Sequence, residues 1–166
     1  DIIVASTGVI GQPLSLDPIA AAITPLASGL SASGGALAAE AIMTTDTTVK
    51  EIAVEFTVNG KLCRMGGIAK GSGMIHPNMA TMLVFITTDC AIHPTMLQKA
   101  LSSDIQNTFN MLSIDGDTST NDMVSVLANG MAQNDEIVCD DEAFSIFMKA
   151  LNTVTVALCR MIAEDG

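Results

Sequence analysis

The sequence of 166 residues predicts an α+β fold, in which helices cover β-sheet. Three observations favour it. Apolar and polar residues alternate over residues 51–58, which is the period of a half-buried strand. The unbroken apolar run 82–86 indicates a strand inside a sheet, and apolar residues recur at helical spacing over 144–161. Because the order of strands and helices is mixed, we expect neither a strict β-α repeat nor an all-β fold.

The first forty residues indicate one short strand and two helices. Residues 2–6 are predicted to form a buried strand that ends in a turn. Asp17 is expected to cap a helix that has Pro18 as its first residue and extends to about Gly29, with a kink at Pro25. A second short helix is predicted over residues 35–42.

The middle of the chain carries the clearest strand signals. Residues 52–58 are followed by Asn59-Gly60, a strong signal for a tight hairpin turn, and residues 61–67 are expected to return as the partner strand. Residues 82–88 are apolar for most of their length. They therefore predict a central strand that is covered on both faces.

The last third predicts helices around one further strand. Pro94 is expected to start a helix that ends near Leu101, and residues 108–115 to form a strand. The run 120–122 is expected to cap a helix that extends to Asn129. Acidic residues 140–142 precede the last helix, where they meet the positive end of its dipole. Its expected buried stripe consists of Phe144, Phe147, Met148, Leu151, Val154, Leu158 and Met161.

The composition excludes several classes of protein. The net charge is -11, seven Lys and Arg are scattered among eighteen acids, and Trp and Tyr are absent, which argues against nucleic-acid binding. No stretch approaches the ~18 uncharged apolar residues of a membrane span. The four cysteines, Cys63, Cys90, Cys139 and Cys159, lie in apolar segments without metal-ligand spacing. They are expected to be buried and reduced, which suits a cytosol-like compartment.

The two ends predict that the chain is a piece of a longer one. Residues 1–5 resemble the middle of a buried strand, and residues 163–166 form an acidic turn directly after the last helix. We therefore expect one structural domain that is truncated at both ends. An organelle import signal before Asp1, or further site residues after Gly166, would lie outside it.

Residues 70–81 contain the pattern that most clearly suggests a catalytic function. Glycines at 71 and 73 and Pro77 lead to Ala80 and Thr81, and Thr81 starts the apolar run. A chain that cuts itself before a Thr frees a nucleophile whose own α-amine, with a pKa near ~7.7–8, serves as its base. Alternatively, Thr81 is only the first residue of a strand.

Two further segments offer groups for acyl chemistry. Thr7 and Gly8 follow the first predicted strand, so their hydroxyl and backbone N–H groups could stabilise an oxyanion; the alternative is a structural turn. Lys70 could hold a substrate carboxylate, and the alternative is a solvated loop lysine. The glycine loop lacks the lysine of a nucleotide-binding loop.

An acidic run at residues 115–122 superficially resembles a calcium loop. Its sixth position is Thr120 rather than Gly and its twelfth is Val126 rather than Glu, so a calcium site is excluded. A polar turn that caps the next helix is favoured over a metal site. No metal site is predicted at His76 and His93 either.

Four motifs occur in a specific order: residues 6–11, 43–47, 70–81 and 115–122. Together they resemble the ornithine acetyltransferase family, also called glutamate N-acetyltransferase. The resemblance covers almost all of the chain.

This resemblance implies a self-processing enzyme of arginine biosynthesis. Cleavage between Ala80 and Thr81 would make residues 1–80 the C-terminal part of an α chain and residues 81–166 the N-terminal part of a β chain. Thr81 would take the acetyl group of N2-acetylornithine as an ester and pass it to glutamate.

The same resemblance assigns roles to other residues. Thr7 and Gly8 would form the oxyanion hole, and Thr44, Lys70 and Thr81 would bind substrate. The implied fold is a four-layer α-β-β-α sandwich of the N-terminal-nucleophile type. The implied assembly has two α and two β chains and is cytoplasmic, as in bacteria. No cofactor is implied, although some members accept acetyl-CoA.

Two alternatives to acetyl transfer stay open. An N-terminal-threonine aminopeptidase or amidase would use the same cleavage but deliver the acyl group to water. A non-catalytic binding module would keep the scaffold without cleavage.

Overall fold

The computed structural model describes residues 2–75 and 82–166 and contains one four-stranded sheet within those ranges. The sheet order follows the sequence: β1 (Lys50–Val58), β2 (Lys61–Lys70), β3 (Leu83–Thr88) and β4 (Met123–Ala128). The first two pairings are antiparallel, whereas β4 runs parallel to β3. The predicted α+β class is confirmed.

The β1–β2 hairpin forms as the sequence predicts. Asn59 and Gly60 have φ values of 49° and 76°, the left-handed conformations that a two-residue hairpin turn requires. Strand β2 extends to Lys70, beyond the predicted end at residue 67, because its last residues pair with β3 up to Lys70 opposite Leu83.

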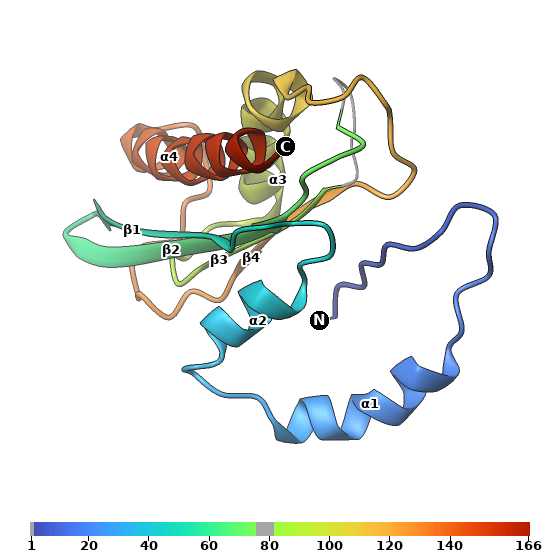
Figure 1. The fold of residues 1–166 in the computed structure, drawn as a ribbon. Coiled ribbons are helices and arrows are strands. Elements are labelled where there is room, and N and C mark those ends of the chain that lie inside the picture. Colours follow the sequence, from blue (N-terminus) through green and yellow to red (C-terminus); the bar gives the residue numbers. More distant parts are fainter. Residues whose placement is uncertain (1, 76–81) are drawn as a thin grey trace.

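Two helices cover one face of the sheet: α4 (Glu142–Asp165) and α3 (Pro94–Asp104), as Figure 1 shows. Both begin where the sequence predicts, and Asp141 caps α4 by accepting a 3.0 Å hydrogen bond from the N–H of Phe144. The buried residues of α4 are Ala143, Phe144, Phe147, Ala150, Leu151, Val154, Thr155, Leu158 and Ile162. Met148 and Met161 lie at the edge of this stripe and are half-buried.

Helix α4 packs closely on β2 at a glycine. A Cβ on Gly67 would lie 2.9 Å from Val154 Cγ1 and 3.0 Å from Leu158 Cδ1, so a side chain there would clash with the helix. By length and composition α4 could cross a membrane, but its apolar stripe packs on the sheet as in a core helix.

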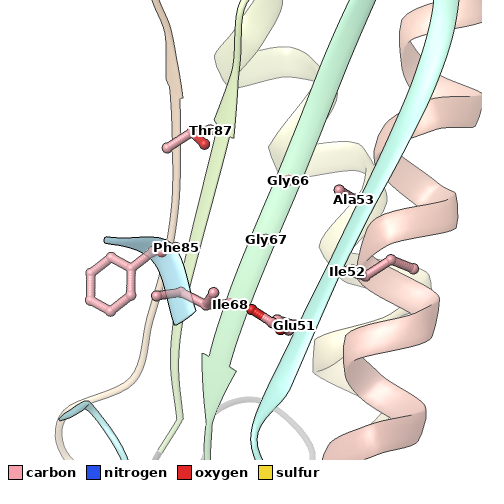
Figure 2. A pocket seen from close by; sticks show the side chains of 9 residues that line it. Glu51, Ile52, Ala53, Gly66, Gly67, Ile68, Phe85 and Thr87 are labelled. Carbon is pink, nitrogen blue, oxygen red and sulfur yellow. The ribbon is translucent and has the colours of Figure 1, made fainter. Parts of the chain in front are cut away.

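The other face of the sheet is open. A hollow of about 610 Å³ lies over β1, β2 and β3, and Figure 2 shows Ile68 and Phe85 among its lining side chains. Phe85 is only half-buried and Thr87 is exposed. The prediction of a central position for β3 is confirmed, but the prediction that it is covered on both faces is wrong for the described residues.

The helices before the sheet match their predicted positions. Helix α1 (Asp17–Ser28) has no buried residue, and Figure 1 shows it away from the sheet; α2 (Gly35–Ala41) lies beside the open face. Asp17 is the first residue of α1 rather than its cap, since the N-cap is Leu16 and has no side-chain hydrogen bond.

Three predictions of secondary structure are wrong. Residues 2–6 form no strand and are largely exposed, with Ile2 at 91%, because no described strand pairs with them. Residues 108–115 contain a 3₁₀ turn, η2 (Phe109–Met111), after η1 (Ile105–Asn107). The predicted helix at 120–129 is strand β4, whose apolar residues pair with β3.

The cysteines differ in environment. Cys63 and Cys90 are buried, Cys159 is half-buried, and all four are free thiols. Burial raises the pKa of Cys90 and of Cys159 to about 12, so neither is a reactive thiolate. Cys139 is exposed, contrary to the prediction, because it lies in the loop before α4.

Candidate functional site

Lys70, the last residue of β2, lies at the centre of the candidate site and is only 3% exposed. The alternative of a solvated loop lysine is therefore wrong. Burial lowers the pKa of Lys70, while the charges of Asp46 and Asp122 act in the opposite direction. A buried cation beside a glycine loop is suited to bind an anionic group.

A second buried lysine, Lys50 at the start of β1, is fully paired. Its Nζ lies 2.7 Å from Asp46 Oδ1 and 2.5 Å from Asp165 Oδ2, and all three side chains are almost completely buried. Thr47 donates to Asp165 from its backbone N–H and its hydroxyl. These hydrogen bonds, with that of Lys50 the strongest, lower the pKa of Asp165. We call Asp46, Lys50 and Asp165 the paired cluster.

Asp46 connects this cluster to the glycine loop. Its Oδ1 accepts a 2.6 Å hydrogen bond from the Gly71 N–H, and its Oδ2 accepts one of 3.1 Å from the Thr44 N–H. Burial alone would raise the pKa of Asp46, but these bonds and Lys50 hold it below its ordinary value. Thr44, which is exposed, is thereby linked through Asp46 to Gly71, the residue that follows Lys70.

The acidic run 115–122 holds the chain on both sides of residues 76–81. Asp115 accepts hydrogen bonds from the N–H groups of Met74, at 2.5 Å, and Ile75, at 2.9 Å. Met74 has a φ of 58°, a region that non-glycine residues rarely adopt, so Asp115 stabilises an unfavourable backbone conformation. The predicted helix-capping role is wrong, because the next element is β4.

Asp122 holds the chain after residues 76–81, as Asp115 holds it before them. Its Oδ1 accepts a 2.8 Å hydrogen bond from the Met82 N–H, whereas its Oδ2 is buried without a hydrogen-bond partner among the described residues. Burial raises the pKa of Asp122, and the Met82 N–H and the charge of Lys70 only partly oppose this. A sequence pattern does not predict this role, because Asp115 and Asp122 accept hydrogen bonds from residues that lie 40 or 41 positions earlier in the chain.

Thr7 and Gly8 lie next to this region. Residues 6–12 line a pocket of about 240 Å³ together with Thr120 and Asn121, which directly precede Asp122. Thr7 is half-buried and Gly8 is exposed. The structure thus brings the candidate oxyanion donors to the loop that contacts Met82.

Ala80 and Thr81, the predicted cleavage site and nucleophile, lie outside the described residues, as does His76. The described residues on either side of them are held by Asp115 and Asp122. In the described ranges, no group of three or more His, Cys, Asp or Glu side chains is arranged to hold a metal ion.

Comparison with known proteins gives consistent matches. The model of the ArgJ family matches residues 1–166. "Arginine biosynthesis bifunctional protein ArgJ" of Caldanaerobacter subterraneus is 51% identical over 166 residues, which cover 100% of this chain and 41% of that protein. The protein of the same name from Symbiobacterium thermophilum is 53% identical over 163 residues, 98% of this chain and 40% of its own length.

A solved structure of similar sequence is also found. It is the arginine biosynthesis bifunctional protein argJ from Bacillus halodurans, with 43% identity and a TM-score of 0.47 over 51% of this chain and 38% of the other. The chain spans about two fifths of the length of the curated relatives that it matches.

Proposed function

This chain belongs to the ArgJ family, and we propose that it is part of a self-cleaving acetyltransferase of arginine biosynthesis. Cleavage between Ala80 and Thr81 frees Thr81, which takes the acetyl group from N2-acetylornithine and passes it to glutamate. The proposal rests on the hydrogen bonds by which Asp115 and Asp122 hold the chain on both sides of residues 76–81, together with the burial of Lys70.

The proposed roles agree with acyl chemistry. Self-cleavage, acetylation of Thr81 and its deacetylation each pass through a tetrahedral intermediate, so one oxyanion hole at Thr7 and Gly8 serves all three steps. The buried cation of Lys70 receives a substrate carboxylate in a region that excludes water, where the interaction is strong. Thr44 completes the proposed binding residues.

The proposed whole protein has a second sheet on the open face of the present one. The hollow over β1–β3, with Ile68 and Phe85 in its lining, supports the proposal of a four-layer α-β-β-α sandwich. We further propose an assembly of two α and two β chains in the cytoplasm, with no cofactor and with acetyl-CoA as an alternative donor.

Self-cleavage is tested by the mass of the full-length protein under denaturing conditions. Two fragments that meet before Thr81 are expected in the wild type, whereas Thr81→Ala stays uncut. Thr153→Ala is the matched control, since Thr153 is exposed on α4 and is expected to leave cleavage unchanged. A break before residue 81 in Thr81→Ala would refute the assignment of the nucleophile.

Acetyl transfer is tested with isotope-labelled N2-acetylornithine. The label is expected on Thr81 in the absence of glutamate and in N-acetylglutamate after glutamate is added. Acetate as the sole product would instead favour the aminopeptidase or amidase alternative. Thr7→Ala removes one proposed oxyanion contact and is expected to slow acetyl transfer by about 10²–10³-fold.

A further inference from the structure

Thr44 and Lys70, two of the proposed substrate-binding residues, lie on different segments of the chain. Thr44 belongs to the segment between α2 and β1, whereas Lys70 is the last residue of β2. If both residues bind one substrate, the two segments must keep a fixed separation, because binding groups have to stay within about 0.5 Å of the productive geometry. The structure joins the two segments at one buried carboxylate, that of Asp46.

The Asp46 carboxylate accepts hydrogen bonds from both segments. Its Oδ2 lies 3.1 Å from the N–H nitrogen of Thr44, and its Oδ1 lies 2.6 Å from that of Gly71, the residue that follows Lys70. The side chain is completely buried, and Lys50 Nζ donates to the same Oδ1 at 2.7 Å. Hydrogen bonds to an ionised carboxylate are short and strong, so one group holds the backbone of both segments.

A second link lies beside the first one. The hydroxyl oxygens of Thr45 and Ser72 are 2.8 Å apart near the surface. We propose that Asp46 is a positioning residue of the proposed active site, which does not contact the substrate but holds Thr44 and Lys70 at the separation that binding requires. This inference rests on the proposed function and adds to it the group that fixes two of its binding residues.

Asp165 provides a direct contrast to Asp46. Both carboxylates pair with Lys50, but within the described ranges only Asp46 accepts hydrogen bonds from Thr44 and Gly71. Replacing either aspartate by asparagine leaves Lys50 one buried carboxylate. An asparagine at position 46 has a single acceptor oxygen and cannot satisfy all three donors. Only that variant should therefore release the two segments from each other.

The test measures steady-state acetyl transfer by the full-length protein. Asp46→Asn should raise the KM for N2-acetylornithine and for glutamate by about 10-fold, close to the contribution of one hydrogen bond to a charged group, while kcat changes much less. Asp165→Asn is the matched control. It should shift the urea midpoint about as far as Asp46→Asn does, because it also removes one carboxylate from Lys50, but it should leave both KM values unchanged.

Amide hydrogen exchange tests the link without any substrate. The peptide that contains Gly71 should exchange about 10-fold faster in Asp46→Asn than in the wild type, and at the wild-type rate in Asp165→Asn. If the wild type transferred no acetyl group, the proposed function would be wrong. Faster exchange in Asp46→Asn alone would then still support Asp46 as the residue that joins the two segments.

Two kinetic results would overturn the proposal: unchanged KM values in Asp46→Asn, or equal increases in Asp46→Asn and Asp165→Asn. Ser72→Ala removes the second link and keeps every buried charge, so it should fold and raise both KM values by about 2- to 5-fold. If Asp46→Asn does not fold, Ser72→Ala decides, and unchanged KM values in that variant would overturn the proposal.

Discussion

Two buried charged regions of this protein differ in how their charges are satisfied. In the paired cluster, Lys50 contacts both Asp46 and Asp165, and Thr47 supplies further hydrogen bonds. At the proposed active site, Lys70 is buried and forms no ion pair with a described carboxylate, and Asp122 Oδ2 has no hydrogen-bond partner among the described residues. A buried charge with all its partners in the protein has a structural role, whereas one that lacks a partner indicates a binding site.

The largest expected effect comes from breaking the paired cluster. Lys50→Met leaves Asp46 and Asp165 buried without their cation, which should lower the free energy of unfolding by about 3–5 kcal/mol. Urea denaturation followed by circular dichroism measures this loss. Lys61→Met is the control, because Lys61 is exposed on β2 and should change stability by less than about 0.5 kcal/mol. A small loss for Lys50→Met would show that the cluster is not structural.

Low pH should also reduce the stabilisation by the paired cluster, but by less than Lys50→Met does. The pKa values of Asp46 and Asp165 are lower in the folded protein than their ordinary value, so the unfolded chain binds protons more readily. Their stabilisation is complete above about pH 4 and is lost as the pH falls toward the folded pKa values. The loss is smaller than in Lys50→Met because a protonated carboxyl still forms hydrogen bonds. Denaturation curves between pH 2 and pH 6 measure it, and Lys50→Met should flatten the pH dependence.

The smallest effect on stability is expected at Lys70. Lys70→Met removes a buried charge that has no ion pair among the described residues, so the free energy of unfolding should change by less than about 1 kcal/mol. The same substitution should abolish acetyl transfer to glutamate if Lys70 binds the carboxylate. Denaturation and product analysis on one preparation check both statements. If Lys70→Met lowered the free energy of unfolding as much as Lys50→Met does, Lys70 would have a structural role like that of Lys50.

Local sequence determined the elements whose signals lie within a few residues. The alternation over 52–58 with Asn59-Gly60 predicts the hairpin, because side-chain period and turn conformation are local properties. The apolar stripe of α4 and its cap at Asp141 are also encoded within one short segment of the sequence. The glycine loop and Lys70 were likewise predicted as site residues from their motif.

Contacts between segments that are distant in the sequence determined the other elements and the environments of the charged residues. The apolar run 123–128 becomes a strand because β3 lies beside it, and residues 2–6 stay exposed because no described strand pairs with them. The burial of Lys70, the ion pairs of Lys50 and the hydrogen bonds of Asp115 and Asp122 also depend on contacts across many residues. A sequence motif shows which charged groups are present, but only the tertiary structure determines which of them lose water and which find a partner, since both depend on what packs around them.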